Sequence, residues 1–192
     1  GSVGRGTFVC GPDATKRRTR GVGSAEFMAM QDTGLIPMRA NLPASTGQNA
    51  IVAGAMEALM RQPDFRAHVA DYAEPGGSAA QREAAAHWFG HADFNPHPDS
   101  LILTAGAQQA LATAIAVATE PGDLILTEAF TYRVIATQCQ LMGRRLRPVA
   151  MDANGMMPDA LDEAARAHRP RAVFIIPTLQ NPTGIVMDAA RR

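Results

Sequence analysis

The sequence predicts an α/β fold with a mostly parallel sheet, because short apolar runs alternate with helical segments through its second half. Four runs have the length and composition of buried strands: LILT at 101–104, LILT again at 124–127, RRLRPVAM at 144–151 and AVFIIP at 172–177. Helical patterns separate them, at 107–118, 131–143 and 158–168. This order is typical of parallel strands joined by right-handed crossovers.

Two further helices are expected before the first of these strands. The segment QNAIVAGAMEALMR at 48–61 has apolar residues at helical spacing, and Pro63 ends it. AAQREAAAHWF at 79–89 follows a turn, YAEPGG at 72–77. Residues 1–33 differ, since they are rich in Gly, Arg and Lys and show no sustained apolar period. That composition indicates a linker.

Composition excludes several classes of protein. The chain has 192 residues and 46% apolar residues, which is enough for one substantial core. Acidic and basic residues balance at 18 each, so the net charge argues neither for nor against a nucleic-acid partner. The apolar stretches are too short or too helix-like to cross a bilayer, and the start lacks the apolar core of a signal peptide. We therefore expect a cytoplasmic protein without a membrane partner.

Neither cysteines nor histidines have the spacing of a metal site. Cys10 and Cys139 lie far apart, which favours free thiols over a disulfide or a metal site. His87 and His91 are four residues apart and would share a helix face, but no carboxylate or cysteine is placed to join them. No metal is expected.

Ligands of parallel sheets bind beyond the carboxyl ends of the strands, and three groups of residues fall there. The first is TAGAQQ at 104–109. Gly106 permits an unusual backbone angle, and the N–H groups of Ala107 and Gln108 at the helix start form an anion site. The alternative is an ordinary turn that uses glycine. The pattern is neither GxGxxG nor a P-loop, so a dinucleotide or nucleoside triphosphate is not expected.

The other two groups follow the next strand and the last one. Tyr132, in EAFTY after the second LILT, offers a ring that would stack on a flat ligand, although a tyrosine at a helix start is often only packing. Asn181, in NPTG after AVFIIP, offers an amide donor, although it would equally suit a turn that caps the next helix. An anion site, a stacking ring and an amide donor together suit pyridoxal 5′-phosphate.

These motifs also resemble a known family. TAGAQQAL, PGDLILTEAFTY, GMMPDAL and IIPTLQNPTG are similar, in order and spacing, to the first half of fold-type I aminotransferase domains. The resemblance runs from about Asn41 to the end of the chain. It implies the large domain of a PLP-dependent transferase, with a three-layer, mostly parallel sheet that is incomplete here.

The amino-terminal residues resemble a second known domain. VGRGTFV at 3–9 is similar to the last strand of the winged-helix domain of GntR-type regulators, in which a glycine-arginine wing meets DNA. A wing, a basic linker with KRRTR at 16–20 and an aminotransferase-like domain occur in that order in MocR-type transcriptional regulators. The resemblance thus implies a wing strand at 1–10, a basic flexible linker at 11–40 and a PLP domain at 41–192, with Arg5 and Gly6 contacting DNA.

The resemblance implies a role for each matched residue. Gly106 and the backbone amides of Ala107 and Gln108 would bind the cofactor phosphate, Tyr132 would stack on the ring, and Asn181 would donate to its phenolic oxygen. Tyr72 would reach the phosphate in the partner subunit, which implies a homodimer. Asn41 would lie where the substrate enters.

The family's Schiff-base lysine has no counterpart in this sequence, whose only lysine is Lys16 in the linker. No catalytic residue is therefore assigned, and we expect the sequence to be a fragment that is inactive and prone to aggregate. Three functions remain for the parent protein. It is expected to be a DNA-binding regulator that responds to an amino acid or amine; the alternatives are an aminotransferase that transfers amino groups through PLP and a structural dimerisation module.

Overall fold

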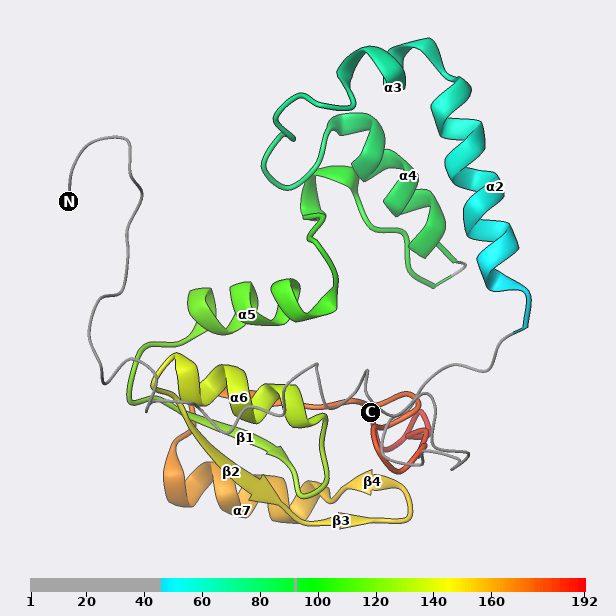
Figure 1. The fold of residues 1–192 in the computed structure, drawn as a ribbon. Helices are drawn as coiled ribbons and strands as arrows, with labels where there is room; N and C mark the ends of the chain where they lie inside the picture. The colour runs from blue at the N-terminus through cyan, green and yellow to red at the C-terminus, as the bar shows by residue number, and fades with distance from the viewer. Residues whose placement is uncertain (1–45, 92) are drawn as a thin grey trace, which may run out of the picture. The chain divides into compact units, whose positions relative to one another are not determined.

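The computed structural model describes residues 46–91 and 93–192 (Figure 1). The chain divides into two units, Gly1–Leu42 and Pro43–Arg192, and the description below concerns the second. Arg5, Gly6, Asn41 and the expected segments 1–10 and 11–40 lie outside the described residues. Their expected roles therefore stay predictions.

Three parallel strands form the central sheet, as the sequence predicts. They are β1 (Leu124–Glu128), β2 (Arg145–Val149) and β5 (Ala172–Phe174), in the order β2-β1-β5. Leu126 of β1 lies opposite Arg147 on one side and Val173 on the other. Because all three strands run in one direction, their carboxyl ends meet at one edge of the sheet.

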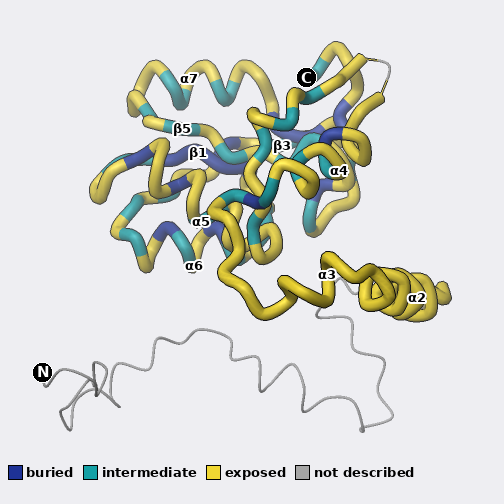
Figure 2. Tube along the Cα trace, turned by 90° about the horizontal axis from the view of Figure 1, so that it is seen from above, coloured by how far each residue is buried: buried dark blue, intermediate teal, exposed yellow. Residues whose placement is uncertain are grey.

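Helices cover both faces of this sheet. Helices α5 (Ala107–Ala118) and α6 (Arg133–Leu141) lie on one face and α7 (Pro158–His168) on the other (Figures 1 and 2). Successive strand residues point to opposite faces, so Ile125 packs with α5 and α6 whereas Leu126 packs with α7. The expected three-layer α/β architecture is confirmed, and buried β1 lies in its middle (Figure 2).

A short antiparallel hairpin follows β2 and was not expected from the sequence. Strands β3 (Met151–Asp152) and β4 (Gly155–Met156) form it, so the strand predicted at 144–151 is in fact two elements. Gly155 has a φ of 100°, and a Cβ there would lie 2.6 Å from Cε of Met187. Glycine thus allows the hairpin to pack closely against the segment that follows β5.

The predicted strand at 101–104 is absent from the described structure. Residues 101–104 pair with none of the described strands, and Ile102 is 73% exposed. The Leu103 N–H donates to the Gly76 carbonyl instead, at 2.9 Å. An apolar run becomes a strand only when a neighbouring strand accepts its hydrogen bonds, and none of the described strands lies beside this one.

The helices that precede residue 101 begin and end largely as the sequence predicts. They are α2 (Gln48–Arg61), α3 (Pro63–His68), α4 (Ala79–Phe89) and the 3₁₀ turn η1 (Pro98–Ser100). A capping box formed by Ser78 and Gln81 begins α4. Pro63, which ends α2, also begins α3, and this short helix was not expected.

Much apolar surface in this part of the chain is exposed. None of the residues of α2 is buried, and Ile51 and Met56 are 74% and 62% exposed. Exposed apolar area of this kind favours association, and the expectation that the chain aggregates stays a prediction. Within the described ranges, no helix has both the length and the apolar character that crossing a membrane requires.

Candidate functional site

The amino terminus of α5 presents backbone N–H groups to open space. Gly106 precedes the helix with φ 90° and ψ 164°, and no side chain caps the first turn. The Ala105 N–H is already engaged, since it donates to Oε1 of Gln109 at 2.5 Å. A Cβ on Gly106 would meet no atom within 4 Å. The first N–H groups of a helix lack intrahelical acceptors, so this end of α5 is suited to an anion.

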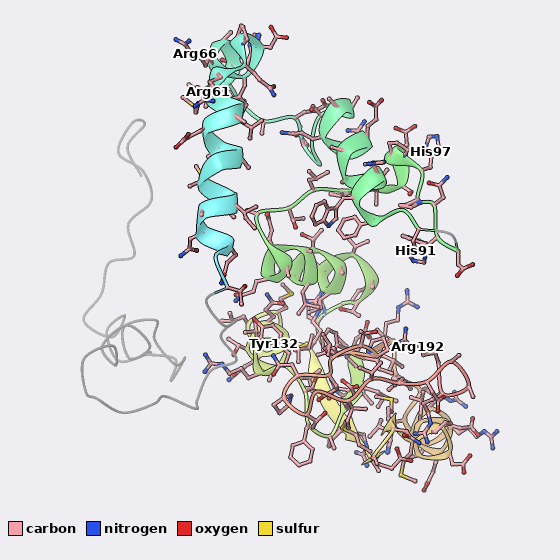
Figure 3. All side chains as sticks on the ribbon, turned by 90° about the vertical axis from the view of Figure 1, so that its right-hand side faces the viewer. Arg61, Arg66, His91, His97, Tyr132 and Arg192 are labelled. Atoms are coloured by element: carbon pink, nitrogen blue, oxygen red, sulfur yellow. The ribbon has the colours of Figure 1, made fainter. Side chains whose placement is uncertain are left out.

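A hydrogen bond joins this helix terminus to the loop after β1. The side-chain amide Nε2 of Gln108 donates to the Tyr132 hydroxyl at 3.2 Å. Nε2 of Gln138, in α6, donates to the Gln108 carbonyl at 2.7 Å. Tyr132 itself lies directly before α6 and is labelled in Figure 3. The start of α5 and the loop after β1, which lie far apart in the sequence, are therefore adjacent.

The turn that contains Asn181 lies at the same edge of the sheet. Its neighbour Gln180 is buried, and Nε2 of Gln180 donates to the Phe130 carbonyl at 2.5 Å and to Oε2 of Glu128 at 3.2 Å. Glu128 is the last residue of β1. Asn181 is half-buried and is joined to Pro182 by a cis peptide bond. The structure thus places the NPTG turn beside the loop that leads to Tyr132.

Sequence reasoning missed Glu128, Gln180 and Gln138. A signal for the first was present, because a carboxylate directly after the buried run Ile125–Thr127 needs a polar partner. Gln180 and Gln138 have no such local signal. Their roles depend on hydrogen bonds to residues 52 and 30 positions away in the chain.

Tyr72 is not part of this cluster within the single chain. It lies between α3 and α4, and its side chain is fully exposed. Across the described ranges, no hydrogen bond joins Tyr72 to the sheet edge. Of the six residues predicted to bind the cofactor, five lie at this sheet edge: Gly106, Ala107, Gln108, Tyr132 and Asn181. The sixth, Tyr72, lies away from it with an exposed side chain.

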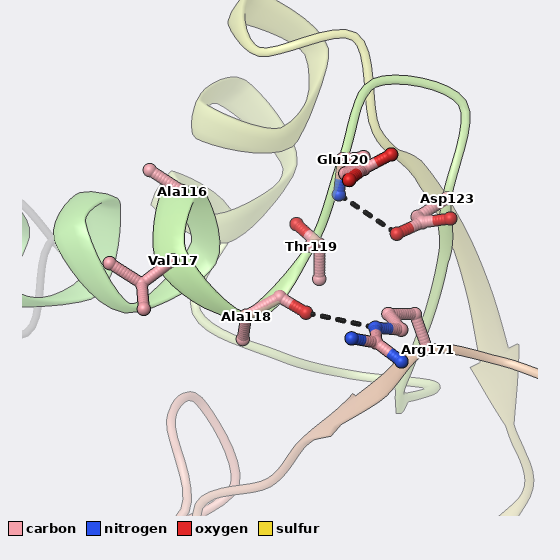
Figure 4. Close-up of a pocket in the computed structure, with 7 residues that line it drawn as sticks. All are labelled: Ala116, Val117, Ala118, Thr119, Glu120, Asp123 and Arg171. Atoms are coloured by element: carbon pink, nitrogen blue, oxygen red, sulfur yellow. Dashed lines mark hydrogen bonds between the residues drawn. The ribbon is translucent and has the colours of Figure 1, made fainter.

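A separate hollow of about 390 Å³ lies at the other end of β1 (Figure 4). The carboxyl end of α5, the turn before β1 and Arg171 line it. Its polar groups bond to one another: Nε of Arg171 donates to the Ala118 carbonyl at 3.2 Å, and the Glu120 N–H donates to Oδ2 of Asp123 at 2.8 Å. This hollow is therefore distinct from the edge that contains Gly106 and Asn181.

The residues at that edge fit a phosphorylated aromatic ligand. The open helix terminus suits a phosphate, the Tyr132 ring lies next to it, and Asn181 follows the neighbouring strand. A three-layer α/β domain with these groups at its carboxyl edge has the fold of the PLP-dependent transferases of fold-type I.

The chain belongs to the class I and II aminotransferase family, whose profile matches residues 33–191. It is 34% identical over 113 residues to 2-aminoadipate transaminase of Thermus thermophilus. The aligned region covers 59% of this chain and 27% of that protein. It is 26% identical over 160 residues to YdeF of Bacillus subtilis, an HTH-type transcriptional regulator. That aligned region covers 83% of this chain and 34% of the regulator.

A solved structure agrees with this assignment. LysN, the α-aminoadipate aminotransferase of Thermus thermophilus in complex with N-(5′-phosphopyridoxyl)-L-leucine, has a TM-score of 0.74 and 26% sequence identity. The match covers 95% of this chain and 44% of LysN. Family membership implies pyridoxal 5′-phosphate as the cofactor. The chain spans about a quarter to a third of the length of the curated relatives it matches.

Proposed function

We propose that residues 41–192 form the cofactor-binding part of an aminotransferase-like effector domain in a DNA-binding transcriptional regulator. The hydrogen bond between Gln108 and Tyr132 carries the cofactor half of this proposal, because it joins an anion site to an aromatic ring at one sheet edge. An amino acid or amine that reacts with the bound cofactor would be the signal.

Each residue at the edge has one task in binding. Gly106 leaves room for the phosphate, and the N–H groups of Ala107 and Gln108 donate to it. Tyr132 stacks on the pyridine ring, and the Asn181 amide donates to the phenolic oxygen, which favours the anionic form of that oxygen. When bound, the cofactor supplies a ring that withdraws electrons from an attached amino compound.

The regulator half of the proposal rests on the amino-terminal sequence. VGRGTFV and the basic KRRTR precede the domain, and we assign Arg5 and Gly6 to DNA contact and 11–40 to a linker. The match to YdeF, an HTH-type transcriptional regulator, which extends over most of the chain, supports a regulator as the parent protein. We further propose a homodimer in which Tyr72 reaches the partner's cofactor phosphate and Asn41 approaches the substrate.

The second candidate is an aminotransferase. The identity to 2-aminoadipate transaminase, which is higher than that to YdeF, favours it. In this case the same edge would hold the cofactor during transfer of an amino group between an amino acid and a 2-oxo acid.

One pair of assays separates the two candidates. Protein made from the complete reading frame that contains this sequence would be tested for binding to its own upstream DNA and for steady transfer of amino groups. DNA binding that changes when PLP and an amino acid are added together, without turnover, supports the regulator. Sustained turnover without specific DNA binding supports the enzyme and contradicts the regulator.

A further inference from the structure

The buried side chain of Gln180 connects two segments of the candidate site. It is 2% exposed, and both ends of its amide are bonded. Nε2 donates to Oε2 of Glu128 and to the Phe130 carbonyl, and Oε1 accepts from the N–H and the hydroxyl of Thr183 at 3.0 and 2.7 Å. A single side chain therefore holds the loop after β1 and the NPTG turn together.

Glu128 completes this arrangement from the end of β1. Its side chain is 1% exposed, and its Oε2 also accepts from the Ile176 N–H at 3.2 Å. No group among the described residues donates to its Oε1. A buried carboxyl group is costly, and an apolar side chain would fill this strand end at lower cost. An apolar side chain could not, however, hold the segment from Ile176 to Gln180.

We propose that Glu128 and Gln180 are positioning residues that set the distance between Tyr132 and Asn181. Phe130 lies two residues before Tyr132, and Gln180 directly precedes Asn181. The bonds of Gln180 therefore fix the segment that contributes the stacking ring relative to the segment that contributes the amide donor. The inference rests on the proposed cofactor site, in which those two residues contact the ring and its phenolic oxygen.

A purely structural role of the pair predicts a different result from a positioning role. If the pair only stabilised the fold, its loss would leave the properties of a bound ligand unchanged in the folded molecules. If it positions Asn181, its loss weakens the hydrogen bond to the phenolic oxygen. The pKa of the bound phenol then rises, because that bond favours the ionised form.

The test uses the full 192-residue chain with 4′-deoxypyridoxine 5′-phosphate, which has the ring, phenol and phosphate of the cofactor but no aldehyde. Affinity comes from equilibrium dialysis, and the phenol pKa from ultraviolet absorbance of the bound probe. The variants are Gln180→Ala, Gln180→Glu, Glu128→Gln and the double variant E128Q/Q180E. Gln140→Ala, in an exposed position of α6, is the matched control.

The proposal predicts a graded series. Gln180→Ala weakens probe binding about tenfold and raises the phenol pKa, whereas Gln140→Ala changes neither. Gln180→Glu weakens probe binding more than Gln180→Ala does, because it places a second carboxyl group beside Glu128. Glu128→Gln keeps an oxygen that accepts from Ile176 and Gln180, so it stays within about threefold of the parent chain. The double variant binds more tightly than Gln180→Glu, because Gln at 128 then donates to Glu at 180.

Two outcomes separate the inference from the proposed function. If the parent chain binds the probe and Gln180→Ala leaves affinity and phenol pKa unchanged, the inference is overturned, whereas the proposed cofactor site is supported. If the parent chain does not bind, the proposed function fails, and hydrogen exchange in the ligand-free chain decides the inference. Exchange that is faster in Gln180→Ala than in Gln140→Ala in both 129–132 and 178–184, with α7 unchanged, supports it, because only these two segments are joined by Gln180. Equal exchange, or faster exchange throughout 124–187, overturns it.

Discussion

Nε2 of Gln108 donates a hydrogen bond to the hydroxyl oxygen of Tyr132 across 3.2 Å, although 24 positions separate the two residues in the chain. One residue lies in the first turn of α5, and the other lies directly before α6. The parallel order of the strands brings both helix starts to one edge of the sheet. The helix terminus suited to an anion and the aromatic ring therefore lie next to each other at that edge.

This relationship predicts a difference between two substitutions of Tyr132. Tyr132→Phe loses the bond from Gln108 but keeps the ring, so affinity for 4′-deoxypyridoxine 5′-phosphate falls by about threefold or less. Tyr132→Ala also loses the stacking surface and weakens binding by about tenfold or more. Equilibrium dialysis measures both, and equal losses would contradict stacking.

The packing of the β3–β4 hairpin predicts that Gly155→Ala is destabilising. The added Cβ meets Cε and Cγ of Met187 at 2.6 and 3.1 Å, at a φ of 100°. Backbone strain and overpacking together cost about 2 kcal/mol, measured as the free energy of unfolding in urea. Gly122→Ala is the control, since φ there is 94° but an added Cβ would have no atom within 4 Å. Its loss of unfolding free energy should be smaller than that of Gly155→Ala by about 1 kcal/mol. Equal losses would show that Met187 moves away freely.

The ion pair between Asp152 and Arg191 predicts a dependence of stability on pH. The guanidinium of Arg191 donates to both oxygens of Asp152 at 3.1 and 2.9 Å. This bond, and a second from the Asn154 N–H, lower the pKa of Asp152 below its ordinary value of 3.8. A lowered pKa stabilises the folded chain fully above the ordinary value, and that contribution is lost as pH falls through the lowered one.

Asp152→Asn and Arg191→Gln test this expectation. The urea midpoint of the parent chain should exceed that of either variant at neutral pH, and the difference should shrink once pH falls below the ordinary carboxyl pKa. The urea midpoint of the double variant should be lowered no further than that of either single variant, because both substitutions remove the same ion pair. A difference that persists unchanged at low pH would show that the ion pair is not its source.

The buried thiol of Cys139 predicts slow modification. Cys139 lies in α6 and is 1% exposed; burial raises the pKa of its thiol, against a smaller lowering by Arg144. The thiol is therefore protonated at neutral pH and poorly reactive. In a Cys10→Ser variant, which retains only Cys139, a thiol reagent should react more than about tenfold more slowly with the folded chain than with the chain in urea. Similar rates would contradict burial.

Much of the fold followed from local sequence patterns. The bounds of α2, α4, α5 and α7 match the expected segments, because turns, proline and glycine mark where apolar periodicity begins and stops. The run at 101–104 has the same letters as 124–127, yet only the second is a strand. Strand formation depends on a neighbour in space, and a local pattern carries no information about that neighbour.

For the candidate site, the sequence predicts the residues but not the contacts that hold them in place. The sequence predicts Gly106, Gln108, Tyr132 and Asn181 as site residues because each follows a strand or begins a helix, where ligands of parallel sheets bind. The contacts that hold these residues in place were not predictable, since Gln180 reaches Glu128 across 52 positions. The hairpin after β2 was missed because two-residue strands leave no detectable alternation.

The binding of 4′-deoxypyridoxine 5′-phosphate to the 192-residue chain, compared between Asn181→Asp and Asn154→Asp, tests the central claim most directly. Asn154 lies exposed in the β3–β4 turn and serves as the matched control. The account predicts that the parent chain and Asn154→Asp bind the probe alike. Asn181→Asp should bind about tenfold more weakly with a raised phenol pKa, because the donor is lost and a negative charge faces the phenolic oxygen. Equal binding by both variants, or no binding by the parent chain, would contradict the account.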